Sequence, residues 1–176
     1  MHIMIDLETM GTRADAPIIS IGAVAFDKDG VTQVFYRPVA LQSSVRSGAV
    51  IDPQTVMWWL RQSAAARAAL EDGEDEAVSL EDALRDFSQL VCSYGDSLKG
   101  VWGNGASFDN TIMHESAHRT KVPLWEFWKD RCYRTVKSSH PDVAMERVGD
   151  HHNALDDAKS QALHLIAINQ KYPYYL

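Results

Sequence analysis

The sequence has little cysteine and no long apolar segment, and each absence excludes a class of protein. Only Cys92 and Cys132 occur in 176 residues, too few for a disulfide framework and without the paired spacing of a zinc site. No apolar run approaches the ~20 residues that a membrane helix needs. The N-terminus reads as a core strand and not as a signal peptide. We therefore expect buried free thiols, no membrane association and a cytoplasmic protein.

Positive charge is also scarce. The chain has 17 Lys and Arg against 24 Asp and Glu, a formal net charge of -7 at pH 7. Broad, non-specific binding of nucleic acid depends on Lys and Arg that neutralise phosphates, so this balance argues against it. It does not argue against an enzyme that holds divalent cations, because such ions lie between an acidic protein and an acidic substrate.

Four carboxylates and one histidine are the most informative residues that are present. Asp6 and Glu8 lie two residues apart after an apolar run, so on a strand both side chains leave the same face. Asp109 lies in the middle of the chain, and His152 and Asp157 lie five apart where the last helix is expected to begin. Carboxylates that hold two Mg²⁺ ions, together with a histidine as base, form the residue set of a two-metal nuclease site.

In this order and at these intervals, the motifs resemble those of the DnaQ-like exonucleases. This is the DEDDh group, in which the last motif carries a histidine and which includes the RNase T-like enzymes. The three motifs are Asp6 to Thr9, Asn104 to Asp109, and His152 to Asp157. The neighbours His151 and Asp156 lack the family spacing, so we expect them to face elsewhere.

The resemblance covers nearly the whole chain and implies the RNase H-like fold. Residues 55–59 are also similar to the branch of phage-encoded exonucleases and small bacterial 3′ exoribonucleases. The length fits one domain, residues 1–176, and the pattern predicts an α/β protein with a mixed sheet of five to six strands flanked by helices. We expect strands at 3–7, 18–26, 31–38 and 100–104, and helices from Pro53, from Ser79, from Ser107 to about 118, and from Asn153 to about 172.

The resemblance also implies a chemistry: release of 5′-mononucleotides from the 3′ ends of RNA or DNA with two Mg²⁺ or Mn²⁺ ions. It implies that Asp6 bridges both ions, that Glu8 and Asp157 bind one, and that Asp109 acts on the other. His152 is then the general base, because imidazole titrates near neutral pH. The implied partners are single-stranded or 3′-overhanging nucleic acid, and a homodimer is compatible with the family. RNA and DNA both stay open.

Five residues are predicted to contact the substrate. Thr9 and Met10 follow the acidic pair, where the family places residues against the terminal nucleotide, and Phe108 is expected to stack on the penultimate base. Trp58 and Trp59 are adjacent on a predicted helix and point about 100° apart. One of them is therefore expected in the core, and the other is a candidate stacking surface for substrate, with partial burial or a dimer contact as the alternatives. For Met10 and Phe108, a place in the core is the open alternative.

Two other functions compete with this interpretation. Residues 114–118 read His-Glu-Ser-Ala-His, the zinc-protease pattern, with His114 and His118 as ligands and Glu115 as base. The glycine and third histidine that would extend one such pattern are absent, and the helix directly follows Asp109. An inactive nucleic-acid-binding module is the other alternative. The complete carboxylate set argues against it, because clustered like charges are costly to keep.

Two charged segments lie outside the motifs. Residues 71–76 contain five acids in six positions and are predicted to form a solvated loop. Residues 119–140 contain six Lys and Arg, interleaved with four aromatic residues. This composition suits a groove that follows the backbone of a single strand, with a solvated loop as the alternative.

Overall fold

The computed structural model describes residues 1–72, 75–149 and 152–176, in which five strands form one mixed sheet of order β3-β2-β1-β4-β5. β1 (His2–Thr9) lies at the centre, antiparallel to β2 (Ile18–Asp27), which is itself antiparallel to β3 (Gly30–Pro38). On its other side β1 runs parallel to β4 (Gly100–Gly103), and β4 runs parallel to β5 (Asp130–Cys132). The sheet confirms the predicted antiparallel meander and the mixed α/β class.

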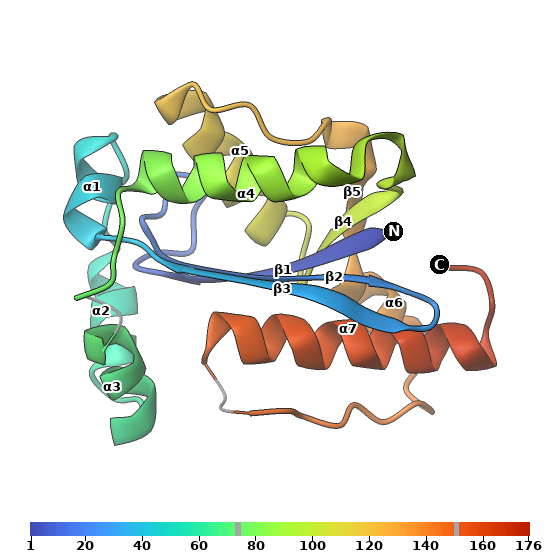
Figure 1. The fold of residues 1–176 in the computed structure, drawn as a ribbon. Helices are drawn as coiled ribbons and strands as arrows, with labels where there is room; N and C mark the ends of the chain where they lie inside the picture. The colour runs from blue at the N-terminus through green and yellow to red at the C-terminus, as the bar shows by residue number, and fades with distance from the viewer. Residues whose placement is uncertain (73–74, 150–151) are drawn as a thin grey trace.

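Helices cover both faces of this sheet (Figure 1). α4 (Leu80–Tyr94) and α5 (Asp109–Thr120) pack on one face, and α6 (Tyr133–Ser139) and α7 (Ala154–Lys171) pack on the other. The three short helices α1 (Leu41–Arg46), α2 (Pro53–Trp59) and α3 (Ala64–Asp72) lie together at one end of the sheet. These layers are those of the expected RNase H-like fold. None of the helices in the described ranges is both long and apolar enough to span a membrane.

The alternation of β1 decides which face carries the acidic pair. Ile3 and Ile5 belong to the core beneath α4 and α5, whereas Met4 belongs to the core beneath α6 and α7. Asp6 and Glu8 continue the even positions, so both leave the sheet on the α7 side. The single buried strand therefore presents two carboxylates to one layer of helices, as the spacing predicts.

Three predicted helix starts are confirmed by their capping hydrogen bonds. The Asp52 side chain accepts the Gln54 N–H, with proline in the first turn, and Ser79 accepts the Asp82 N–H. The side chain of Asn153 accepts N–H groups from the first turn of α7. Side-chain caps are local in sequence, which explains why the pattern locates these helix ends correctly.

Other expectations are wrong in detail. The helix of the second motif begins at Asp109 and not at Ser107, because residues 105–109 first form a turn in which Phe108 and Asp109 donate to the Gly105 carbonyl. Short elements such as α1, α3 and β5 are not predicted, and α3 extends into the acidic segment that we expect to be a loop; residues 73–74 of that segment lie outside the described residues. Cys92 is exposed and Cys132 only partly buried, contrary to the expected buried thiols.

Candidate functional site

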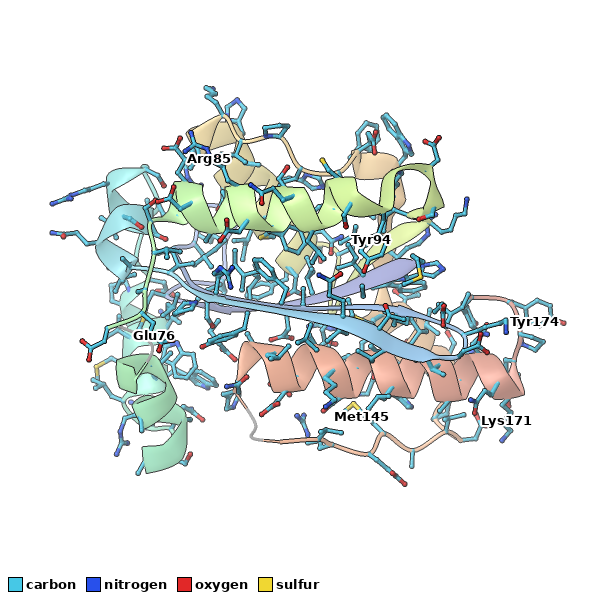
Figure 2. The ribbon with its side chains drawn as sticks, viewed as in Figure 1. Glu76, Arg85, Tyr94, Met145, Lys171 and Tyr174 are labelled. Carbon is cyan, nitrogen blue, oxygen red and sulfur yellow. The ribbon has the colours of Figure 1, made fainter. Side chains whose placement is uncertain are left out.

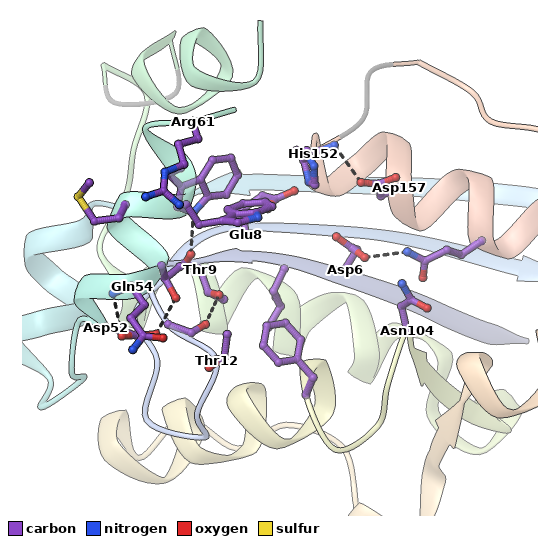
Figure 3. A pocket seen from close by; sticks show the side chains of 18 of the residues that line it. Asp6, Glu8, Thr9, Thr12, Asp52, Gln54, Arg61, Asn104, His152 and Asp157 are labelled. Atoms are coloured by element: carbon purple, nitrogen blue, oxygen red, sulfur yellow. Dashed lines mark hydrogen bonds between the residues drawn. The ribbon is translucent and has the colours of Figure 1, made fainter. Parts of the chain in front are cut away.

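A cavity of about 980 Å³ opens where β1 ends, between the α2 region and the start of α7 (Figure 3). Asp6, Glu8, His152 and Asp157, from the first and third motifs, all line it. Segments far apart in the sequence thus contribute to one concave site, which is the usual form of a ligand-binding or catalytic site.

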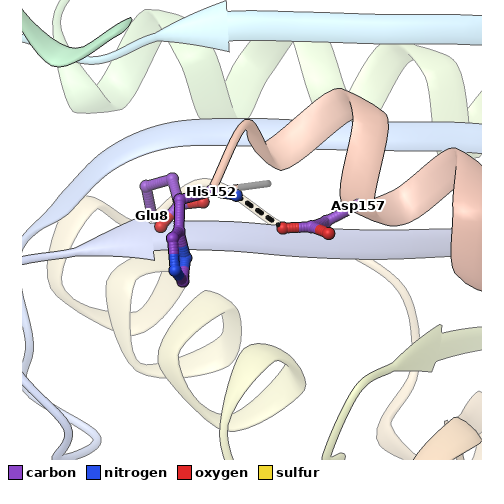
Figure 4. Close-up of side chains that lie close together, drawn as sticks. All are labelled: Glu8, His152 and Asp157. Atoms are coloured by element: carbon purple, nitrogen blue, oxygen red, sulfur yellow. Dashed lines mark hydrogen bonds between the residues drawn. The ribbon is translucent and has the colours of Figure 1, made fainter. Parts of the chain in front are cut away.

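The most compact group in this cavity consists of Glu8, His152 and Asp157. One potential ligand atom of each side chain lies within 4.8 Å of the others (Figure 4). The backbone N–H of His152 also donates to Asp157 Oδ2 at 3.1 Å, which connects the last residues before α7 to its first turn. His151 lies outside the described residues. The geometry brings the predicted base next to two of the predicted metal ligands.

Asp6 lies on the same strand face as Glu8 and accepts a hydrogen bond from Gln161 Nε2 at 2.7 Å, drawn at Asp6 in Figure 3. Gln161 is 4% exposed, and its Oε1 has no hydrogen-bond partner in the described part of the chain. No sequence motif identifies Gln161. Its position one helical turn after Asp157, on the same face of α7, is the signal that could have revealed it.

A glycine in β2 lets α7 approach the acidic pair. Gly22 is the strand partner of Asp6, and a Cβ atom built at Gly22 would lie 2.1 Å from the carbonyl carbon of Ala154. Real side-chain atoms do not come so close to backbone, so only glycine allows the first turn of α7 to rest on the sheet here. This contact brings Asp157 to Asp6 and Glu8. A glycine inside a strand is a weak signal in a sequence, and none of the predictions above depends on Gly22.

Asp109 is 2% exposed and is not part of the cavity lining, but its charge acts on both acids of β1. Its Oδ2 atom has no hydrogen-bond partner among the described residues. A buried carboxylate oxygen without a partner is unusual and calls for a compensating group. Asp109 therefore lies behind the cavity wall, next to the acidic pair, with an unsatisfied acceptor.

The electrostatics of the site disfavour ionised carboxylates. Burial, followed by the charges of Asp109 and Glu8, raises the pKa of Asp6 well above its usual range. Burial, followed by the charges of Asp157 and Asp109, raises the pKa of Glu8 to about 8. Burial likewise raises the pKa of Asp109 to about 7. Such shifts are typical of a site that needs a cation to hold its acids ionised.

One cation of the chain already contacts the group. The Arg147 guanidinium forms an ion pair with Asp157 through Nη1 and Oδ1, and Arg147 lines the cavity. Its position shows that the open side of the acidic group attracts positive charge. The ion pair is partly exposed, so its contribution to stability is small.

The two tryptophans of α2 have different environments. Trp59 is 4% exposed and its Nε1 donates to the Thr9 carbonyl at 3.0 Å, whereas Trp58 is 42% exposed. Both rings meet the His152 ring edge-on, with centroids 5.1 Å away for Trp58 and 5.9 Å away for Trp59. The expectation that one is core and the other more exposed is confirmed, and the structure identifies Trp59 as the core residue.

Of the other predicted substrate residues, Thr9 and Phe108 line the cavity and Met10 does not. Thr9 is buried, its hydroxyl donates to the Gly11 carbonyl at 2.7 Å, and it lines the cavity together with Phe108. Met10 is not part of the lining. A contact between Met10 and a terminal base thus stays a prediction from the resemblance, without support from the cavity.

The histidines of the zinc-protease pattern do not form a comparable group. Within residues 1–72, 75–149 and 152–176, the cluster of three metal-binding side chains is Glu8, His152 and Asp157. Instead, His114 Nε2 lies 3.2 Å from Asp130 Oδ1, and the centroids of the His114 and Trp125 rings are 4.7 Å apart. The geometry gives the zinc alternative no support.

Comparison with known proteins identifies a nuclease family. The family model described as "3′-5′ exoribonuclease Rv2179c-like domain" matches residues 1–169. A protein named exodeoxyribonuclease, from Enterobacteria phage T4, is 27% identical over 156 residues, which cover 75% of this chain and 68% of the phage protein.

Two solved structures share the fold. The nuclease domain of 3′hExo, a DEDDh family member bound to rAMP, has a TM-score of 0.68 and 14% identity, with 97% of this chain and 92% of that chain covered. The Mg²⁺- and Mn²⁺-bound form of S. pombe Pop2p has a TM-score of 0.65 and 15% identity, with coverage of 97% and 83%. At this identity the two structures establish the fold.

Proposed function

The chain belongs to the Rv2179c-like family of 3′-5′ exoribonuclease domains, and on that premise we propose how it removes nucleotides from 3′ ends. The enzyme class, a 3′-5′ exonuclease that acts on nucleic acid, follows from the family. The metal ions, the base and the substrate contacts are our proposal. It treats residues 1–176 as one catalytic domain, with a cytoplasmic location and a homodimer as further predictions.

Asp6, Glu8, Asp109 and Asp157 would hold two divalent cations, Mg²⁺ or Mn²⁺. Burial raises the pKa of Asp6, Glu8 and Asp109, and neighbouring carboxylate charges add to the shift at Asp6 and Glu8. Among the described residues, Asp109 keeps an oxygen without a hydrogen-bond partner. Oxygen ligands of this kind suit Mg²⁺ and Mn²⁺, and ionisation of the acids becomes favourable when positive charge is present. When bound, such ions neutralise charge on the scissile phosphate and activate the attacking water.

His152 would take the proton from that water. Its ring lies beside Glu8 and Asp157, and edge-on contacts with Trp58 and Trp59 restrict its orientation. A positioned general base contributes roughly 10²- to 10⁴-fold to a reaction rate. The single observation that supports this role most strongly is the compact group of one histidine and two carboxylates at the cavity wall.

The exposed Trp58 ring is the proposed stacking surface for a base of a single strand. Phe108 and Thr9 line the same cavity and are proposed to contact the terminal nucleotides, as is Met10 from the resemblance alone. The family description names RNA, whereas the name of the phage relative indicates DNA. The preferred sugar therefore has to be measured.

The test compares 5′-labelled single-stranded RNA and DNA of one sequence, incubated with Mg²⁺, Mn²⁺ or EDTA. We expect a metal-dependent ladder that shortens from the 3′ end, and a faster reaction on the preferred sugar. The His152→Ala variant should lose about 10²- to 10⁴-fold in rate. His118→Ala is the matched control, because it removes a histidine of the α5 pattern, and it should keep full activity.

Two outcomes would contradict the proposal. Absence of cleavage of either strand with every metal would favour the binding-module alternative. Loss of activity in His118→Ala, with His152→Ala unaffected, would restore the zinc alternative on α5.

A further inference from the structure

A second cavity, of about 470 Å³, adjoins the candidate active site. It shares three lining residues, Asn104, Lys137 and Met145, with the larger cavity. Met145 is labelled in Figure 2, in the segment that runs below α7. Because the same residues line both, the two cavities are adjacent, and a chain-like ligand that follows the surface of the protein could occupy both.

Asn104 marks the direction of this extension. In Figure 3 it lies on the side of Asp6 opposite to Glu8 and Thr9. Trp58 and Thr9 line only the larger cavity, on the side where the terminal nucleotide is proposed to bind. A strand whose scissile phosphate lies at Asp6 would therefore continue past Asn104 into the second cavity.

Two cations of α6 line the second cavity. Arg134 and Lys137 are three residues apart, so they lie on the same side of the helix. Both are exposed, and neither side chain is in a hydrogen bond or ion pair within the described ranges, although the charge of Arg134 acts on Asp109 and lowers its pKa. Arg134 lies against Gly105 of the second motif. A Cβ atom added to Gly105 would be 3.4 Å from the guanidinium carbon of Arg134. Gly105 has φ +147°, a conformation that favours glycine and keeps this approach open.

The other titratable groups that face this cavity have protein partners. His140 Nε2 lies 2.7 Å from the Tyr175 hydroxyl, and its ring stacks on Tyr172. His164 lies between the Tyr133 hydroxyl and the Val143 carbonyl, at 2.6 and 2.8 Å. Arg134 and Lys137 are thus the positively charged side chains of this cavity that can bind an anionic ligand.

We propose that the second cavity binds the phosphodiester backbone upstream of the scissile bond, with Arg134 and Lys137 each contacting one phosphate of a single strand. The inference rests on the proposed function and adds the path of the strand. It also explains how an acidic protein binds a polyanion: the positive charge is local and lies beside the site, while the net charge stays negative.

The first test is the salt dependence of binding. A fluorescent single strand of eight nucleotides is titrated with the protein at several salt concentrations. The buffer contains Ca²⁺ in place of Mg²⁺, so that the strand is bound without being cut. Each phosphate contact of a single strand contributes about 0.7 to the slope of log K against log salt concentration. Arg134→Gln and Lys137→Gln should each lower the slope by about 0.7, and the double variant by about 1.4.

The matched control is the double variant Lys28→Gln with Lys171→Gln. It removes the same charge, but both lysines are paired with aspartates and lie outside the two cavities. Lys171 is labelled in Figure 2 at the end of α7 far from its first turn. This control should keep the wild-type slope, because neither lysine lies on the proposed path of the strand. It therefore shows the effect of the lost net charge alone. Melting curves of all variants confirm that they are folded.

The second test is the dependence of kcat/KM on strand length. A dinucleotide has only the scissile phosphodiester, whereas an octanucleotide also has upstream phosphates. The α6 double variant should lose at least about tenfold more kcat/KM on the octanucleotide than on the dinucleotide. An equal loss on both lengths would overturn the inference, because the two cations would then act at the scissile bond.

Failure of the inference can be distinguished from failure of the proposed function. If wild type and control bind and shorten the strand while the α6 double variant keeps their salt slope, the upstream path is wrong and the exonuclease stands. If wild type and control neither bind nor shorten any strand, the proposed function itself is wrong.

Discussion

Burial, neighbouring negative charge and a hydrogen bond all act on the pKa of Asp6. Burial and the neighbouring carboxylates raise its pKa, while the hydrogen bond from Gln161 lowers it. Gln161 is therefore a positioning residue: it orients one Asp6 oxygen and makes the ionised form of Asp6 easier to reach at neutral pH. No motif predicts this role: the position of Gln161 one helical turn after Asp157 is its one sequence signal, and a glutamine carries no charge that would single it out.

Gln161→Leu should weaken metal binding more than it weakens the fold. The variant removes the hydrogen bond to Asp6, so protons compete better with the metal for this carboxylate. A hydrogen bond to a charged group contributes about 1.5 to 3 kcal/mol, which corresponds to roughly tenfold or more in affinity. Isothermal titration with Mn²⁺ at pH 7 measures it, with the exposed Gln89→Leu on α4 as control. Equal Mn²⁺ affinity in both variants would refute the positioning role.

The two tryptophans of α2 should respond differently to substitution. Trp58→Ala should lower the affinity for a single strand by about 1 to 3 kcal/mol, the value of one stacked base. Trp59→Phe removes the hydrogen bond to the Thr9 carbonyl and should lower the free energy of unfolding by about 1 kcal/mol. Fluorescence anisotropy and urea denaturation measure the two effects. The assignment is wrong if Trp58→Ala binds the strand like wild type.

At the scale of the elements, the site depends on how two of them meet. β1 supplies Asp6 and Glu8, and the first turn of α7 supplies Asp157. The Asn153 cap sets where α7 begins, and Gly22 lets that end of the helix touch the sheet. A change in this contact would move Asp157 relative to the acidic pair without altering any predicted ligand.

Gly22→Ala should therefore abolish metal binding and also destabilise the protein. Its Cβ would lie 2.1 Å from Ala154, so α7 would have to move away from the sheet. The control is Ala25→Gly in the same strand, which should cost only about 0.5 to 1 kcal/mol of stability and leave α7 in place. Mn²⁺ titration and thermal melting check both variants. Full Mn²⁺ binding by Gly22→Ala would show that the close contact is not needed.

At the scale of the whole molecule, the acidic site makes the stability of the protein depend on pH and on metal. The pKa of Glu8 is about 8 in the folded state, above its usual value of 4.5. Between these values the folded chain holds a proton that the unfolded chain has lost. The contribution of Glu8 to the stability of the metal-free protein therefore falls as pH rises through this window and levels off above about pH 8.

We expect the melting temperature in EDTA to fall between about pH 7 and 8.5, and Mg²⁺ to raise it more at the higher pH. This pH range avoids the titration of His2, whose pKa is lowered to about 4 by burial. Below neutral pH, His2 makes the stability of the protein rise with pH, opposite to the effect of Glu8. At a concentration of 100 times its Kd, an ion stabilises by about 2.7 kcal/mol. Glu8→Gln should flatten the pH dependence. A melting temperature in EDTA that rises with pH would contradict the assignment.

Features of this protein that depend on neighbouring residues can be predicted from its sequence. The spacing of Asp6 and Glu8 places them on one strand face, and the caps at Asp52, Ser79 and Asn153 begin three helices. Strand alternation and capping act over a few residues, so a linear pattern is enough to predict them. The order of the three motifs likewise indicated the family that the comparisons then established.

Which distant residues complete the site depends on how the chain packs in three dimensions. Gln161 reaches Asp6 across 155 positions of sequence, and the α7 contact at Gly22 depends on how the sheet and the helix pack. The burial of Trp59 in place of Trp58, and the open position of Arg134 beside Gly105, are decided in the same way. Such contacts form between surfaces that become neighbours only after folding, and no local spacing encodes them.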